Sequence, residues 1–313
     1  MCRFDLIEID NFVVDLLGAL MTPLGLVKLP DLMELSAGSS DVGVGLIDGP
    51  VAVGHSDLAG NIREAPGAAA ACAEATSAAY VHGTFVAGVL CAKRGSVAPA
   101  VCPDCTLVVR PVFAEAATGN LDSPSAEPEE LAAAILACIE AGARVINLSL
   151  ALMQSSPQAR QALRQALDYA ARRGVLIVAA AGNQGDVGGT TITAHPWVVP
   201  VGACDLRGRP LNESNLGHSI GRRGVLAPGE QVTSLGSEGK PLTLGGTSAA
   251  APFVTGAIAL IWSLIPTASG AELRLAMLQA HARARTTVTP PLLNAWAVYQ
   301  ILLATTRSRT IHA

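Results

Sequence analysis

Aromatic and charged residues are scarce in this chain of 313 residues. Aromatic residues make up 4% and charged residues 15%, and the formal net charge is −4. Because no basic stripe is available to meet phosphates, the sequence excludes a nucleic-acid partner. Half of the residues are hydrophobic and 31 are glycine, a composition that favours a large core in which helices pack closely on a sheet.

The chain also lacks a good targeting segment and a comfortable membrane span. The apolar stretch 12–27 is interrupted by Asp15 and preceded by acids, whereas a signal peptide needs a positive first region. The apolar run 249–265 is short for a membrane span and contains Pro252, so we interpret it as a buried helix. We therefore expect a cytoplasmic protein with no membrane partner.

Seven cysteines are dispersed along the chain, and this odd set does not form the framework of a secreted disulfide protein. Cys102 and Cys105 form a lone CxxC motif, which is compatible with two thiols, a local disulfide, or metal or redox chemistry. No acidic cluster with calcium-ligand spacing is present. The sequence therefore predicts neither a metal site nor a cofactor.

The rest of the chain alternates between short aliphatic runs and helical patterns. Strands are predicted at 41–48, 106–113, 144–150, 175–181 and 197–204, and helices at 80–90, 128–142, 157–173, 249–265, 271–283 and 291–304. This order predicts an α/β three-layer sandwich, with a mainly parallel central sheet covered by helices on both faces. We expect one domain at 37–313 after an N-terminal extension at 1–36, broken at Pro23 and Pro30.

Four polar residues stand at the ends of these elements. Asp48 ends a strand and Asn183 lies in a glycine-flanked turn. An alternative interpretation is that each is an ordinary turn residue with no functional role. His82 is predicted to open a glycine-rich apolar helix. Ser248 follows two glycines at the start of the 249–265 helix, where Ser is also a favoured N-cap residue. Unpaired N–H groups at that helix end would stabilise an anion, which suits a nucleophile.

Four short segments occur in an order that defines a family resemblance. They read Leu-Ile-Asp-Gly at 46–49, His-Gly-Thr at 82–84, Ala-Gly-Asn at 181–183 and Gly-Thr-Ser-Ala-Ala-Ala-Pro at 246–252. Together they resemble the subtilisin-like serine proteases (subtilases), whose acid, histidine and serine follow in this order. The resemblance implies a subtilisin-like sheet and makes 37–313 the catalytic domain of a serine endopeptidase.

The same resemblance implies the roles of individual residues. Asp48, His82 and Ser248 would form the catalytic triad, and Asn183 would supply an oxyanion donor. Their partner would be a peptide or protein substrate. The wall of the substrate-binding pocket would be formed by Ser149, Leu150, Ala151 and Gly182.

A finer resemblance concerns the subtilases that mature cyanobactin-type ribosomal peptides. Ile-Asp-Gly-Pro-Val at 47–51 is similar to their sequence, which implies a precursor peptide as substrate. From the short segment before the first predicted strand we expect folding without a cleaved pro-domain. The chain departs from the family at three places. Ala249 stands where Met is common, which is a tolerable exchange, and Phe85 stands where a second His is frequent, which changes packing rather than chemistry. Residues 151–152 stand where glycines open the pocket. A preference for large apolar side chains is therefore not expected. The alternative is a subtilase-fold peptide- or leader-binding protein with little or no turnover.

Overall fold

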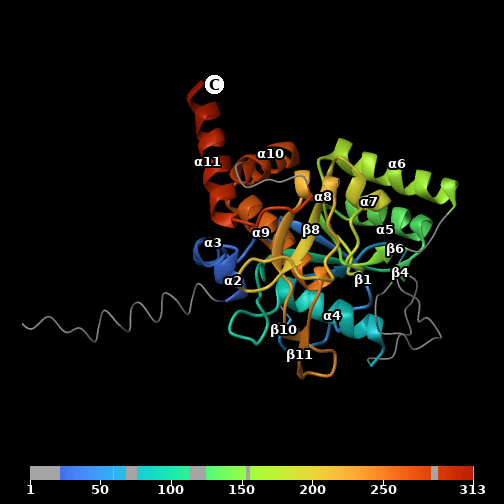
Figure 1. The fold of residues 1–313 in the computed structure, drawn as a ribbon. Coiled ribbons are helices and arrows are strands. Elements are labelled where there is room, and N and C mark those ends of the chain that lie inside the picture. The colour runs from blue at the N-terminus through green and yellow to red at the C-terminus, as the bar shows by residue number, and fades with distance from the viewer. Residues whose placement is uncertain are drawn as a thin grey trace, which may run out of the picture.

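The core of the protein is one seven-stranded sheet with the strand order β2-β3-β1-β5-β7-β8-β9 (Figure 1). A computed structural model describes residues 22–58, 60–67, 76–112, 125–152, 156–282 and 288–312. The strands are β1 (Gly43–Asp48), β2 (Ile62–Glu64), β3 (Thr106–Pro111), β5 (Ala143–Leu148), β7 (Leu176–Ala180), β8 (Val198–Cys204) and β9 (Val225–Pro228). Every neighbouring pair in this sheet is parallel, so the carboxyl ends of all seven strands meet at one edge.

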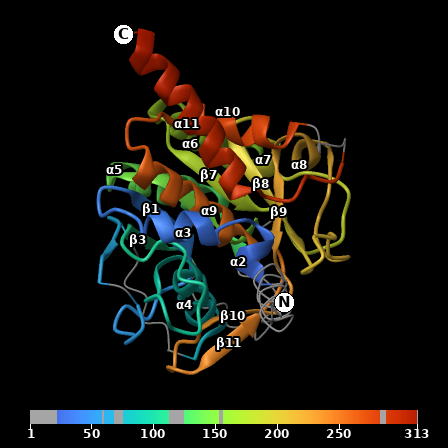
Figure 2. The same ribbon diagram turned by 90° about the vertical axis from the view of Figure 1, so that its left-hand side faces the viewer.

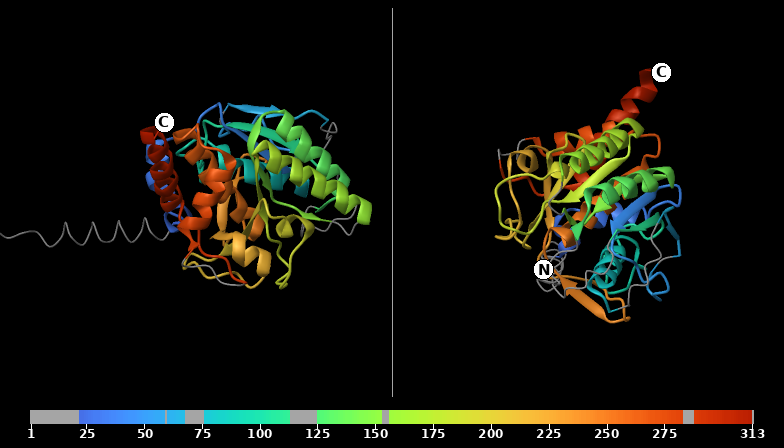
Figure 3. Two further views of the ribbon diagram at one scale, coloured as in Figure 1. Left: turned by 90° about the horizontal axis from the view of Figure 1, so that it is seen from above. Right: turned by 90° about the vertical axis from the view of Figure 1, so that its right-hand side faces the viewer.

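Helices cover both faces of the sheet, as the sequence predicts. On one face lie α5 (Pro128–Glu140) and α6 (Pro157–Arg173), and on the other α4 (Ala78–Cys91) and α9 (Thr247–Leu264) (Figures 1 and 3). Strand side chains alternate between two buried clusters: Leu46 packs on the α4 and α9 side. Its neighbour Ile47 packs on the α5 and α6 side. The three-layer α/β sandwich is confirmed.

Helix α9 is the buried centre of one layer. By length and composition it could cross a membrane, but 83% of it is buried inside the protein. Its side chains contact strand residues from the middle of the sheet and helix α4. The prediction of a buried helix from the apolar run at 249–265 is confirmed.

The N-terminal segment packs onto this layer. Pro23 and Pro30, which we expected to break helices, instead begin α2 (Pro23–Leu26) and α3 (Pro30–Leu35), because the missing N–H of proline costs nothing in a first helical turn. Leu29 and Leu32 are fully buried in the same core cluster as α9. Residues 1–21 lie outside the described residues, so the boundary at 36 stays a prediction.

The C-terminal segment forms α10 (Gly270–Ala280) and α11 (Ala295–His312). Helix α11 contacts α10 at its beginning and then projects from the body (Figures 1 and 2). Both helices were predicted, but α11 begins four residues later and ends eight residues later than the expected 291–304.

The sequence prediction missed several short elements. No element was predicted between the strand at 41–48 and the helix at 80–90, where β2 lies. None was predicted at 205–247 either, and that stretch contains α8 (His218–Arg223) and the sheet strand β9. The same stretch contains the hairpin of β10 (Val232–Leu235) and β11 (Pro241–Leu244), and the short helix α7 (Thr191–Ala194) lies before β8. A second ladder, β4 (Ser125–Ala126) with β6 (Ala151–Leu152), is parallel. Strands of two to four residues carry too little periodicity to be recognised.

The cysteines of the described residues are buried free thiols, at positions 91, 102, 105, 138 and 204. Cys102 and Cys105 therefore form no disulfide in this structure. Among the described residues, no three His, Cys, Asp or Glu side chains come together in a group that could hold a metal ion.

Candidate active site

The site begins with a buried carboxylate at the carboxyl edge of the sheet. Asp48 is the last residue of β1 and is fully buried. Its Oδ1 accepts hydrogen bonds from the Gly49 backbone N–H at 2.6 Å and from His82 Nδ1 at 2.7 Å. Because an ionised carboxylate can only accept, the Nδ1 proton of His82 points at Asp48, and Nε2 is left with its lone pair.

Helix α4 brings His82 to that carboxylate. Its N-cap is Ser77, whose side chain accepts from the Tyr80 N–H, so His82 lies one turn inside the helix rather than at its start as expected. The first turn packs closely on the chain after β1, since a Cβ at Gly49 would overlap the Ala79 carbonyl oxygen. This approach fixes the distance between the imidazole and Asp48.

The environment of His82 sets its basicity. Burial on its own lowers the pKa of His82, while the charge of Asp48 and the hydrogen bond to it raise that pKa by more. The net result is a pKa above the ordinary value of 6.5, because the carboxylate stabilises the imidazolium. An imidazole of this kind is a strong proton acceptor that remains neutral in alkaline solution.

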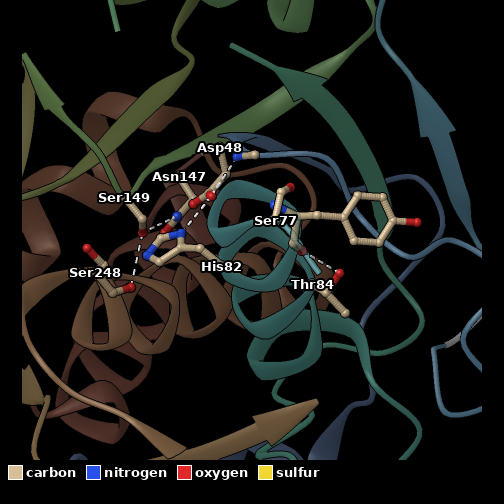
Figure 4. A network of polar contacts seen from close by, with 9 residues as sticks. Asp48, Ser77, His82, Thr84, Asn147, Ser149 and Ser248 are labelled. Carbon is tan, nitrogen blue, oxygen red and sulfur yellow. Dashed lines mark hydrogen bonds and ion pairs between the residues drawn. The ribbon is translucent and has the colours of Figure 1, made fainter. Parts of the chain in front are cut away.

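Ser248 lies in the first turn of α9. The helix starts at Thr247, and its N-cap is Gly246, with φ of 93° and no side-chain cap, so the capping interpretation of Ser248 is wrong. In the close view the imidazole of His82 lies between Asp48 and Ser248 (Figure 4). No hydrogen bond joins His82 to Ser248 among the described residues, and such contacts commonly tighten only when substrate binds.

Asn183 is held against the start of α9. Its Oδ1 accepts from the Thr247 backbone N–H at 2.8 Å and from Thr247 Oγ1 at 2.9 Å. A backbone N–H can only donate, so the orientation of the amide is fixed and Nδ2 is left to donate elsewhere. Only glycine fits at 246, where a Cβ would stand 2.8 Å from Asn183 Nδ2. The free N–H groups therefore lie beside the turn that carries Ser248.

A second asparagine shapes the loop around Asn183. Asn215 accepts from the N–H groups of Gln184 and Asp186 through Oδ1, and it donates to the Ala181 carbonyl through Nδ2. Gly182 has φ of 104°, a left-handed conformation that glycine adopts without strain. The Asn215 side chain therefore fixes the path of the 181–186 loop.

The residues expected to bind substrate follow β5. Ser149 is fully buried and Leu150 is 8% exposed, and Ala151 begins β6, which pairs with β4. The Ser149 hydroxyl donates to the Ser248 carbonyl at 3.1 Å. Asn147, the last residue but one of β5, was missed by sequence reasoning, and its only signal is that a polar side chain interrupts a run of aliphatic residues.

Comparisons with known proteins agree with this arrangement. The model of the subtilase family matches residues 39–294. The chain is 31% identical over 255 residues to subtilisin DY of Bacillus licheniformis, covering 80% of this chain and 86% of that protein. It is 32% identical over 253 residues to a subtilisin of Bacillus pumilus, covering 79% and 86%. The chain therefore belongs to the subtilase family, and it is a serine endopeptidase.

Within this family, the solved structures that resemble the chain include maturation proteases. The protease domain of PatA, in a variant form, superimposes with a TM-score of 0.77 at 29% identity, over 86% of this chain and 97% of that one. The prenylagaramide maturation protease PagA gives a TM-score of 0.75 at 27% identity, over 88% and 98%. The subtilisin-like fold and the similarity to maturation proteases are thus both established.

Proposed function

We propose that Asp48, His82 and Ser248 form the triad that cleaves peptide bonds, with Asn183 as an oxyanion donor. The observation that carries the proposal is the 2.7 Å hydrogen bond from His82 Nδ1 to Asp48 Oδ1. It fixes the tautomer in which Nε2 is the base, on the side of the ring that faces Ser248.

The reaction then follows from this proton arrangement. Ser248 Oγ attacks the carbonyl carbon of the scissile bond, and His82 Nε2 takes the hydroxyl proton. Asp48 stabilises the resulting imidazolium without taking the proton itself. The C–N bond then breaks as His82 gives the proton to the leaving amine, which leaves an ester on Ser248. Water attacks that ester while His82 Nε2 takes its proton, and the proton returns to Ser248 Oγ as the acid product leaves.

The negative charge that forms on the carbonyl oxygen needs donors in place beforehand. The Nδ2 group of Asn183 and the backbone N–H of Ser248 serve, because both lie at the start of α9 and neither has a hydrogen-bond partner among the described residues. Donors fixed in this way cost no reorganisation during the reaction. Thr247 holds the amide in place through two hydrogen bonds.

We propose further that the substrate is a ribosomally made precursor peptide. The likeness to PatA and PagA supports this, because they are named as maturation proteases for patellamide and prenylagaramide. The cytoplasm is the proposed compartment, and the buried free thiols support a reducing environment.

A fluorophosphonate probe tests the triad. It should label the wild-type protein but not Ser248→Ala, and Asp48→Asn should slow peptide hydrolysis by about 10⁴-fold, since the imidazole loses its oriented tautomer. Ser263→Ala removes a hydroxyl at the far end of α9 and should label normally. An unlabelled wild type together with an unaffected Asp48→Asn would support the leader-binding alternative instead.

A library of proteome-derived peptides tests the substrate class. Cleavage sites mapped by mass spectrometry should share one narrow motif if the enzyme matures a precursor. Cleavage throughout the library would contradict maturation while leaving the endopeptidase assignment intact.

A further inference from the structure

A proline inside α9 removes one hydrogen bond at the nucleophile. Pro252 lies in the second turn of the helix and has no N–H, so the carbonyl of the residue four positions earlier loses its usual helical donor. That residue is Ser248. A buried carbonyl without a partner is unfavourable, and this one belongs to the residue proposed to attack the substrate.

A side chain from the sheet supplies the missing donor. Ser149 Oγ lies 3.1 Å from the Ser248 carbonyl oxygen, and Asn147 Nδ2 lies 2.8 Å from Ser149 Oγ (Figure 4). The amide nitrogen can only donate and the carbonyl can only accept, so the direction of both bonds is fixed. The single proton of the Ser149 hydroxyl therefore points to the Ser248 carbonyl.

The far end of this chain is anchored in the same helix. Thr255 Oγ1 donates to Asn147 Oδ1 at 2.9 Å and also lies 3.3 Å from the Ala251 carbonyl oxygen, so the Asn147 amide is held against the middle of α9. Asn147, Ser149 and Thr255 are all fully buried. Residues 147 and 149 are two apart and extend from the same face of an extended chain, so they connect α9 to β5 at two points, seven residues apart on the helix.

We propose that Asn147 and Ser149 are positioning residues for the nucleophile. By holding the Ser248 carbonyl, they fix the first turn of α9, which carries both the Ser248 hydroxyl and the N–H that faces the oxyanion. This inference rests on the proposed triad. The sequence analysis expected Ser149 in the wall of the substrate-binding pocket, whereas this proposal has its hydroxyl position the nucleophile.

A double-mutant cycle with Pro252 tests the inference. Ser149→Ala should lower kcat by about 10- to 100-fold with little change in KM, because a displaced nucleophile affects the reaction more than binding. Pro252→Ala returns an N–H to the Ser248 carbonyl, so in that background Ser149→Ala should lower kcat by under about threefold. A merely structural role for Ser149 would give the same loss in both backgrounds, and that result would overturn the proposal.

Further variants keep the test independent of folding and of the triad itself. Ser263→Ala is the matched control, since its hydroxyl also donates to a carbonyl of α9, that of Ala259 at 2.8 Å, and kcat should not change. Where Ser149→Ala unfolds, Thr255→Val loosens Asn147 without changing side-chain shape and should lower kcat in the same direction; an unchanged kcat would contradict the proposal. If the fluorophosphonate probe does not label the wild-type protein, the proposed triad is wrong. If it labels normally but the effects of Ser149→Ala and Pro252→Ala on kcat are additive, only the positioning role of Asn147 and Ser149 is wrong.

Discussion

Gly83 of helix α4 lies directly against Gly49, the residue that follows Asp48. A Cβ at Gly83 would overlap the backbone carbonyl oxygens of Gly49 and Pro50. Both are backbone atoms, so no flexible side chain could move aside. The glycine after His82 and the glycine after Asp48 therefore have one physical purpose, which is to let α4 approach the end of β1 until the imidazole reaches the carboxylate.

Replacing Gly83 by alanine should separate His82 from Asp48. We expect Gly83→Ala to lower the free energy of unfolding by about 1–3 kcal/mol through overpacking and kcat by about 10²-fold through misplacement of the base. Gly54→Ala is the control, because a Cβ there meets nothing within 4 Å. Chemical denaturation and peptide hydrolysis measure the two effects, and unchanged kcat in Gly83→Ala would contradict the packing argument.

The pH dependence of kcat/KM should reflect the raised pKa of His82. The imidazole must be neutral to accept a proton, so the rate rises with pH through that pKa, and the midpoint should lie above 6.5. In Asp48→Asn the charge that raises the pKa is absent while burial still lowers it, so the midpoint of the residual activity should fall below 6.5. The exposed Asp41→Asn should leave the midpoint unchanged. Equal midpoints in wild type and Asp48→Asn would show that another group controls the rate.

Removal of the Asn183 amide should slow turnover without abolishing binding. We expect Asn183→Ala to reduce kcat by about 10²–10³-fold, the magnitude established for removing this kind of donor in a subtilisin, with KM nearly unchanged. Asn61→Ala, at an exposed position, should behave as wild type. Steady-state kinetics on a peptide substrate decide the matter, and a KM effect alone would assign Asn183 to substrate binding.

The N-terminal segment should contribute directly to stability. Leu32 is fully buried under α9, whereas Leu35 in the same helix is 52% exposed. Leu32→Ala should therefore lower the free energy of unfolding by about 2–5 kcal/mol, and Leu35→Ala should change it by no more than about 0.5 kcal/mol. Equal effects in urea denaturation would mean that α3 does not pack as described.

The described cysteines should resist alkylation while the protein is folded. Burial raises the pKa of Cys138 and Cys204 to about 12, so at pH 8 only about 10⁻⁴ of either thiol is the reactive thiolate. Iodoacetamide followed by peptide mass spectrometry should find both unmodified in the native protein and modified after unfolding in guanidinium. Rapid modification of the native protein would show that these sites open.

Local patterns were sufficient for the elements that carry the triad. The β1 strand, α4 and α9 are continuous apolar runs, and Asp48, His82 and Ser248 lie within one turn of the expected element ends. Local patterns did not indicate which side chains hold the site residues in place. Asn215 is one of two asparagines in a polar stretch, and nothing in its neighbourhood in sequence indicates that it binds the 181–186 loop.

The sequence by itself determined that Ser248 would sit at a helix start and that Pro252 would deprive its carbonyl of a partner, because both follow from spacing along one helix. Only the tertiary structure decided which group replaces that partner. Ser149 is 99 residues away in the chain, and it reaches Ser248 because β5 lies against α9 in the folded core. Hydrogen bonds between distant segments depend on how the layers pack, and the periodicity of neither segment encodes them.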